Sequence, residues 1–200
     1  MTLLSENYSG LRPEAGCDEA GRGSLAGPVT AAAVILAEGF NHPLLNDSKK
    51  LTVTQREEAR KIIEENALSY HVAFVEADEI DRINILNAAL KAMHLALRSL
   101  KPQPAFIIVD GNRFHPYGKI PSKCIVKGDG KYASIAAASI LAKCYRDRKM
   151  EELHLQWPQY GWVSNKGYAT QAHIRAIEEY GLSPLHRRTF HLKRQLRLPF

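Results

Sequence analysis

The sequence predicts an α/β fold in which helices flank a central mixed β-sheet. Short apolar runs of strand length alternate along the chain with longer segments whose apolar residues recur at helical spacing. Two of the short runs, residues 29–36 and 105–109, are almost wholly apolar, which is typical of strands covered on both faces. The 200 residues, 45% hydrophobic and 24% charged, have the size and composition of one globular domain.

In the first half of the chain we expect two strands and two helices. Residues 29–36 and 70–75 form the strands. Residues 54–66 form a helix with Thr54 as its N-cap, because Glu57 stands three positions later in the pattern of a capping box. Residues 77–100 form one long helix with apolar side chains at helical spacing.

In the second half we expect strands at 105–109 and 123–126, and helices at 131–153 and 170–180. The first of these strands ends at Asp110, and the last helix is stopped by Gly181. The run 133–142 is rich in alanine and serine. We attribute that run to close packing of its helix on the sheet and assign it no chemistry.

Positive charge is concentrated near the C-terminus. The whole chain has a formal charge of +6, which suits a polyanionic partner but is weak evidence by itself. Between Gly181 and Phe200 there are five Lys or Arg residues and no Asp or Glu. We therefore divide the chain into a folded domain over residues 1–184 and a basic tail over residues 185–200.

The three cysteines, Cys17, Cys124 and Cys144, show no CxxC spacing. Their odd number argues against a disulfide scaffold and a zinc site, and favours reduced thiols in the cytosol. The first sixteen residues contain no apolar segment of a signal peptide, and no stretch approaches the length of a membrane span. We expect a cytoplasmic protein with no membrane association.

Four carboxylates stand where the predicted elements end. Asp18 and Glu19 precede the turn Gly21-Arg22-Gly23, Asp110 closes an apolar strand, and Asp129 lies in a Gly-Asp-Gly sequence before a helix. A carboxylate at the end of a buried strand is costly unless it is hydrogen-bonded or binds a cation. An all-oxygen ligand set indicates Mg²⁺ or Mn²⁺ rather than zinc.

Other interpretations apply to each acid. Asp129 alone is more often a turn residue. Asp18 and Glu19 are neighbours, so a straight strand points them to opposite faces. Asp18 is then the better candidate, and Glu19 needs a bend or the last position of the strand. Asp147 follows Arg146 in a helix, where it forms an ion pair or supports the site from behind.

Six segments resemble, in order, the motifs of bacterial type 2 ribonuclease H. They are Gly16 to Gly23 (GCDEAGRG), Asp47 to Leu51 (DSKKL), Val109 to Gly111 (VDG), Lys127 to Asp129 (KGD), Ala136 to Lys143 (AAASILAK) with Arg146-Asp147 just after it, and Asn165 to Tyr168 (NKGY). The resemblance covers nearly the whole chain from Gly16 to Phe190. One such motif is weak evidence, but six in order make chance an unsatisfactory explanation.

The resemblance implies an RNase H-like fold and a four-carboxylate site made of Asp18, Glu19, Asp110 and Asp129. It implies two divalent ions, with water as the nucleophile. The substrates would be RNA/DNA hybrids and single ribonucleotides embedded in duplex DNA, cut to leave 3′-hydroxyl and 5′-phosphate ends. Removal of misincorporated ribonucleotides or of primers is the physiological role that the family suggests.

Recognition of ribose requires a sensor for the 2′-hydroxyl. The glycines of Gly21-Arg22-Gly23 permit close approach of the backbone to a strand, and the family counterpart of Tyr168 stacks on the sugar at the DNA–RNA junction. A tight turn and a half-buried core tyrosine are the plain alternatives. Five basic residues are candidates for phosphate contacts, which give affinity without sequence choice: Lys49, Lys50, Lys143, Arg146 and Lys166.

The last six residues, QLRLPF, resemble the short motif by which bacterial replication and repair proteins bind the sliding clamp. Its anchors would be Gln195, Leu196, Leu198 and Phe200, presented on a flexible end. The alternative is a tail whose leucines pack back on the domain. We otherwise expect a monomer.

Two other functions remain open from the residues. A metal-dependent DNA nuclease of the resolvase or integrase kind would use the same carboxylates and would cut all-DNA duplexes. A non-catalytic nucleic-acid-binding module would bind hybrids without a divalent ion and would cleave nothing.

Overall fold

The computed structural model describes residues 3–45 and 51–190, which contain a five-stranded mixed sheet in the order β3-β2-β1-β4-β5. The strands are β1 (Glu14–Ala20), β2 (Val29–Leu36), β3 (Ala67–Val75), β4 (Phe106–Asp110) and β5 (Ser122–Ile125). Strand β1 is antiparallel to β2 and parallel to β4, and β5 is parallel to β4. The carboxyl ends of β1 and β4 therefore open at the same edge of the sheet.

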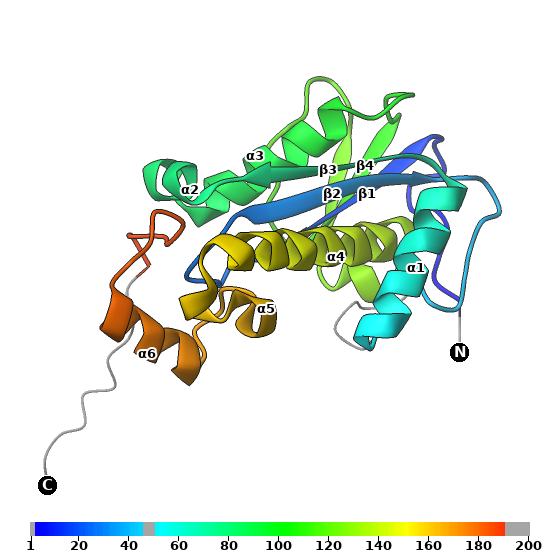
Figure 1. The fold of residues 1–200 in the computed structure, drawn as a ribbon. Coiled ribbons are helices and arrows are strands. Elements are labelled where there is room, and N and C mark those ends of the chain that lie inside the picture. The colour runs from blue at the N-terminus through cyan, green and yellow to red at the C-terminus, as the bar shows by residue number, and fades with distance from the viewer. Residues whose placement is uncertain (1–2, 46–50, 191–200) are drawn as a thin grey trace, which may run out of the picture.

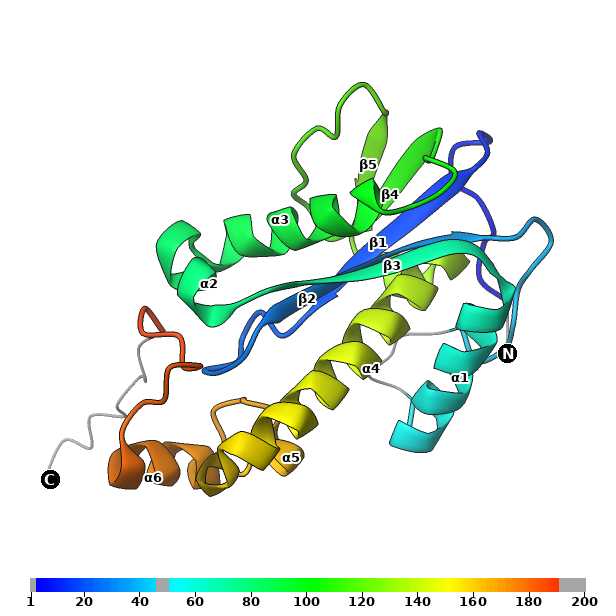
Figure 2. The ribbon, with the colours of Figure 1, turned by 45° about the horizontal axis from the view of Figure 1, so that its top comes forward.

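Helices cover both faces of this sheet, as Figures 1 and 2 show. Helices α2 (Ala77–Ile83) and α3 (Ile85–Arg98) lie on one face, and α1 (Val53–Asn66) and α4 (Ala133–Gln156) lie on the other. The short α5 (Trp162–Asn165) and α6 (Gln171–Tyr180) lie beside the C-terminal end of α4. The predicted α/β fold with a mixed sheet is confirmed.

Strand β2 is apolar throughout because it is covered on both sides. Ala31, Ala33 and Ile35 belong to the core under α3, whereas Ala32 and Val34 belong to the core under α4. Helix α4 packs closely on β1: a Cβ placed at Gly16 would lie 2.3 Å from the carbonyl carbon of Ser134. The predicted role of the small-residue run in packing agrees with this contact.

Two helix boundaries differ from the prediction. The long helix expected at 77–100 is interrupted at Asn84, which has φ 65° and whose side chain accepts a hydrogen bond from the N–H of Asn87. Asn84 thus ends α2 and caps α3. The N-cap of α1 is Thr52, which forms a reciprocal capping box with Gln55, and not Thr54 with Glu57.

The predicted boundary at residue 184 falls inside a packed segment. His186 and Arg187 are each 2% exposed, and His186 forms a β-bridge with Ala26. Residues 185–190 therefore belong to the folded domain and not to the tail. The remaining tail lies outside the described residues, as do Lys49, Lys50 and the four clamp-motif residues Gln195, Leu196, Leu198 and Phe200.

Two further predictions concern the whole chain. All three cysteines are free thiols, as their spacing indicated. No helix in the described ranges combines the length and the apolar character needed to cross a bilayer.

Candidate active site

Strands β1 and β4 bring Asp18 and Asp110 together. Their parallel pairing runs to Cys17 opposite Val109, so the next residue of each strand, Asp18 and Asp110, lies at neighbouring positions on the same face. Cys17 and Val109 point into the core under α3, so the two aspartates point toward α4. Ser139 of α4 lines the same cleft.

Asp18 is a buried carboxylate among other negative charges. Its side chain accepts a hydrogen bond from the N–H of Glu19 (2.7 Å), and the residue is only 7% exposed. Burial, followed by the charges of Glu19 and Asp110, raises the pKa of Asp18 well above its usual range, although a hydrogen bond with Ser139 opposes this. A positive ion at this edge would remove that cost.

Glu19 stands in the strand, because β1 continues through it to Ala20. It points to the face opposite that of Asp18, as the alternation of a straight strand requires. Its side chain pairs with Arg22 (3.0 Å). Glu19 and Asp110 nevertheless line two openings: the cleft that also contains Asp18, and a groove against α3 that also contains Arg113.

Asp129 reaches this edge through a 3₁₀ turn, Gly128–Gly130, that follows Lys127 in the left-handed conformation. The N–H of Gly128 donates to Oδ1 of Asp110 (2.7 Å). A Cβ at Gly128 would lie 2.6 Å from Cδ1 of Ile135, so glycine permits the turn to dock there. Asp129 is 8% exposed, but it is not among the residues that line the cleft.

The turn Gly21-Arg22-Gly23 forms one wall of the cleft. Gly21 has φ +89°, and a Cβ there would lie 1.9 Å from Nε of Arg146. Around Gly23 the space is open, so another backbone or a sugar can approach it. The hydroxyl of Ser24 donates to the carbonyl of Gly21 (2.9 Å) and fixes the turn.

Tyr168 faces the turn across the same cleft and is 36% exposed. The guanidinium of Arg146 lies 5.2 Å from the centre of its ring, and Nζ of Lys143 lies 5.8 Å from it. Lys143 also pairs with Asp147 (2.8 Å). Asp147 therefore forms the intrahelical ion pair that was one of its two interpretations, with Lys143 as partner.

The chain matches the family model described as Ribonuclease HII over residues 15–193. It is 58% identical to the ribonuclease HII of Christiangramia forsetii over 187 residues, which are 93% of this chain and 94% of that protein. The chain belongs to the ribonuclease HII family. The expected type 2 ribonuclease H is thus confirmed, and the protein is a metal-dependent endonuclease.

Solved structures of ribonucleases H2 and HII share this fold. The crystal structure of ribonuclease H2 from Pyrococcus horikoshii has a TM-score of 0.71 and 30% identity, and the match covers 88% of this chain and 93% of that one. The ribonuclease HII of Archaeoglobus fulgidus, solved in a complex with PCNA, has a TM-score of 0.75 and 27% identity, over 91% of this chain and 96% of that one.

The carboxylates of this ribonuclease HII fit a hard divalent ion by chemistry. As they stand, no three Asp, Glu, His or Cys side chains in the described ranges are close enough to hold a metal ion. Glu19 is drawn toward Arg22, and Asp110 accepts from Gly128. Asp18, Glu19 and Asp110 line one cleft, and a divalent ion held there would relieve the mutual repulsion around Asp18.

Two of the predicted phosphate contacts, Arg146 and Lys166, are not among the residues that line the cleft. Arg146 is 0% exposed, and its guanidinium donates to the carbonyls of Pro28 and Lys166 and to the hydroxyl of Ser24. Arg146 therefore stabilises the segments behind the Gly21–Gly23 turn. The ammonium of Lys166 pairs with Glu151 and lines a separate groove between α1, α4 and α5.

Two residues of this ribonuclease HII were missed. Ser139 contacts Asp18 from α4, but an alanine-rich run gives no sign that one serine faces a carboxylate. Arg187 is buried and donates to the carbonyl of Arg22 (2.9 Å). In the sequence it is one of several cations in a basic segment, and only the fold separates it from its exposed neighbour Arg188.

Proposed function

We propose that this ribonuclease HII hydrolyses the RNA strand of RNA/DNA hybrids and also cuts on the 5′ side of single ribonucleotides embedded in duplex DNA, leaving 3′-hydroxyl and 5′-phosphate ends. One observation carries the proposal. A single cleft is lined by the carboxylates Asp18, Glu19 and Asp110 and also by the Gly21–Gly23 turn and Tyr168. Acids for phosphate chemistry and groups suited to a ribose thus share one opening.

Asp18, Glu19, Asp110 and Asp129 would hold two Mg²⁺ or Mn²⁺ ions. When bound, such ions supply an activated water and stabilise charge on the phosphate and leaving oxygen. Asp18 and Asp110 offer oxygens from neighbouring strands, and Ser139 fixes the carboxylate of Asp18. In the described chain no His or Cys lines the cleft, so its residues favour water as the nucleophile.

Selection of a ribose would fall to the turn and to Tyr168. The open space at Gly23 lets backbone N–H and C=O groups approach a 2′-hydroxyl, the group that distinguishes RNA from DNA. The half-exposed ring of Tyr168 offers a flat surface for the sugar. Lys143, at the same cleft, is placed to contact a phosphate.

The test is to incubate the full-length protein with three duplexes of the same sequence and to measure cleavage of each. The first is DNA with a single ribonucleotide, the second is an RNA/DNA hybrid, and the third is DNA only. Each is incubated with Mg²⁺, with Mn²⁺ and with chelator. We expect metal-dependent cutting of the first two and none of the third. Cleavage of the hybrid alone would refute the role given to the turn and Tyr168, and cleavage of all-DNA duplex would indicate a DNA nuclease.

We also propose that the tail binds the sliding clamp through Gln195, Leu196, Leu198 and Phe200. The support is the motif itself, together with the fact that a 27% identical ribonuclease HII was solved with PCNA. Deletion of residues 195–200 should abolish binding to the bacterial clamp, measured by titration calorimetry, while cleavage of a short hybrid is retained. Unchanged binding would refute this. We further propose that the protein is a cytoplasmic monomer; the free cysteines support only the reducing compartment.

A further inference from the structure

The segment that leaves the Gly21–Gly23 turn is held between two other parts of the chain. On one side the N–H groups of Leu25 and Ala26 donate to the carbonyl of Gly167 (2.7 and 3.3 Å). On the other side the N–H of Gly27 donates to the carbonyl of Leu185 (2.9 Å), and a further bond joins residues 187 and 25 (2.8 Å). The turn, the loop that carries Tyr168 and the C-terminal segment therefore form one hydrogen-bonded unit.

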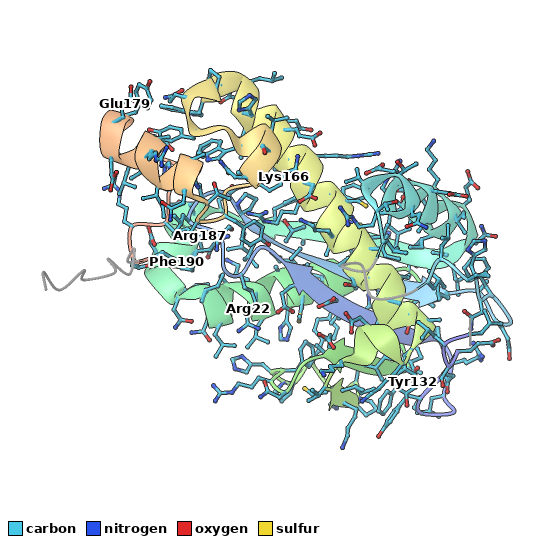
Figure 3. All side chains as sticks on the ribbon, turned by 90° about the horizontal axis from the view of Figure 1, so that it is seen from below. Arg22, Tyr132, Lys166, Glu179, Arg187 and Phe190 are labelled. Carbon is cyan, nitrogen blue, oxygen red and sulfur yellow. The ribbon has the colours of Figure 1, made fainter. Side chains whose placement is uncertain are left out.

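Arg187 fastens the turn itself. Its Nη1 donates to the carbonyl of Arg22 (2.9 Å), at the centre of the turn. Its Nε and Nη2 both donate to the carbonyl of Gly27 (3.0 and 2.9 Å). The planar fork of a guanidinium fits this pair of carbonyls in a way that a lysine ammonium cannot reproduce. Figure 3 labels Arg187 and Arg22 on the ribbon.

Arg187 is almost completely buried. Burial, together with the charge of Arg146, lowers the pKa of Arg187 to about 9. A buried cation is tolerated only when its donors are satisfied. Here the acceptors are backbone carbonyls at both ends of the segment from 22 to 27, so the guanidinium fixes the distance between them.

The neighbouring His186 continues this unit to Tyr168. Nδ1–H of His173 donates to the carbonyl of Tyr168 (3.0 Å), and so Nε2 of His173 accepts from Nε1–H of Trp162 (3.0 Å). Nε2 of His186 lies 3.2 Å from the same nitrogen, and Nδ1 of His186 accepts from the N–H of Ser183 (2.9 Å). Nε2 of His186 therefore carries the proton, and the single lone pair of His173 Nε2 is shared between the N–H groups of Trp162 and His186.

We infer that Arg187 is a positioning residue for ribose selection: it holds the carbonyl of Arg22, while His173, linked to it through His186, holds the carbonyl of Tyr168. The inference rests on the proposed role of the turn and Tyr168 as the ribose sensor. The C-terminal segment sets the separation of these two elements, and neither Arg187 nor His173 touches the substrate.

The kinetic test compares Arg187→Lys with Arg188→Lys, a change of the same kind at the adjacent exposed residue. We expect Arg187→Lys to lower kcat on the single-ribonucleotide duplex by about a hundredfold, since a small misplacement of a positioning group costs about this much. On the long hybrid we expect less than about a tenth of that loss, because a displaced turn still meets a 2′-hydroxyl on a neighbouring nucleotide. Arg188→Lys should match the wild type on both substrates.

The structural test is hydrogen–deuterium exchange of the same full-length variants without substrate. In Arg187→Lys, peptides covering 21–28 and 166–170 should exchange faster, and the rest of the molecule should be unchanged. His173→Asn provides a second variant: its amide can still donate toward the carbonyl of Tyr168, so it should lose less activity than His173→Leu. If Arg187→Lys does not fold, the His173 variants still test the inference, and the converse also holds.

The outcomes separate the two proposals. Local exchange together with a selective loss on the single ribonucleotide supports the inference. Wild-type selectivity and wild-type exchange in Arg187→Lys would overturn it. If exchange in Arg187→Lys is faster throughout the molecule, the His173 variants decide, and equal activity of His173→Asn and His173→Leu would overturn it. If the wild type itself does not cut the single ribonucleotide, the proposed function fails, and the exchange experiment still reports whether Arg187 holds the turn.

Discussion

The two regions that border the cleft treat buried charge in opposite ways. At the carboxyl ends of β1 and β4, Asp18 is buried beside two other acids, and its pKa is raised by burial and by like charges. Behind the turn, Arg146 and Arg187 are buried beside each other, yet backbone carbonyls accept from both guanidinium groups. The chain itself satisfies the cations, whereas the acids still repel one another, and this repulsion favours a cation from outside.

This contrast separates structural from functional charge. A buried ion whose donors meet protein acceptors stabilises the fold around it, and its loss leaves those acceptors unpaired. A buried acid crowded by other acids raises the free energy of the fold and is kept for what it binds. Removal of charge should therefore have opposite consequences in the two regions.

The largest expected effect is the loss of activity in Asp110→Asn. The amide can still accept from the N–H of Gly128, but it is a poor ligand for a divalent ion. We expect cleavage of hybrid to fall about a thousandfold or more, which corresponds to about 4 kcal/mol. The free energy of unfolding, measured in urea, should stay the same or rise, because one of the repelling charges is gone.

The control for this change is Asp78→Asn, at an exposed acid on α2. It should leave activity unchanged and, because Asp78 is in the first turn of α2, should lower the free energy of unfolding by less than about 1 kcal/mol. Active and destabilised Asp110→Asn protein would contradict the comparison, since it would make Asp110 a structural residue.

Arg146→Met should have the opposite effect to Asp110→Asn, because its main consequence should be a loss of stability. The carbonyls of Pro28, Ala26 and Lys166 would lose their donor, at about 1–3 kcal/mol for each buried group left unpaired. We expect the free energy of unfolding to fall by about 4 kcal/mol. Arg148→Met, at an exposed arginine of the same helix that pairs with Glu57, should cost less than about 1 kcal/mol.

A smaller effect should appear in the pH dependence of stability. Burial, then the proximity of His173, lowers the pKa of His186 to about 4, whereas in the unfolded chain it is about 6.5. Between these values the unfolded state binds the extra proton, so stability is full above about pH 6.5 and is lost as the pH falls toward 4. From pH 7 to pH 5 this group should account for about 2 kcal/mol.

The measurement is urea denaturation of wild type and His186→Gln at pH 7 and pH 5. The variant should be less stable at pH 7 but should lose about 2 kcal/mol less on acidification. Equal losses in the two proteins would show that His186 is already free to take a proton in the folded state.

The smallest effect concerns Lys143, which lies at the cleft and pairs only with Asp147 among the described acids. Lys143→Met should weaken binding of hybrid less than about tenfold and reduce the slope of log affinity against log salt by about one. Fluorescence anisotropy at several salt concentrations measures both. Lys61→Met, at an exposed lysine on α1, should leave the slope unchanged. An unaltered slope in Lys143→Met would remove Lys143 from the phosphate contacts.

Periodicity predicted the elements better than it predicted their ends. The apolar runs of β2 and β4 were sufficient to predict these strands, because a strand buried on both faces is apolar at nearly every position. The interruption at Asn84 was missed because the apolar spacing continues across it. Asn84 has φ 65° and ψ 163°, a backbone conformation that the spacing of apolar residues does not indicate.

The acids were easier to place than the basic residues. Asp110 follows an apolar strand, so its position in the sequence already fixes the edge at which it lies. Arg146 and Arg187 were grouped with surface cations, since charge in a sequence carries no sign of burial. All of these acceptors except the carbonyl of Lys166 lie more than 100 residues away along the chain, and only the fold brings them within reach.

The contact between Gly21 and Arg146 has a consequence for how this protein can change by mutation. A Cβ at position 21 would meet Nε of Arg146 at 1.9 Å, so any replacement of Gly21 needs a smaller residue at 146. A smaller residue at 146, however, leaves the carbonyls around the turn without their donor. A substitution at either position alone is therefore harmful, and only a second substitution at the other position could compensate for it. Although they are 125 residues apart, positions 21 and 146 should therefore change together in evolution or not at all.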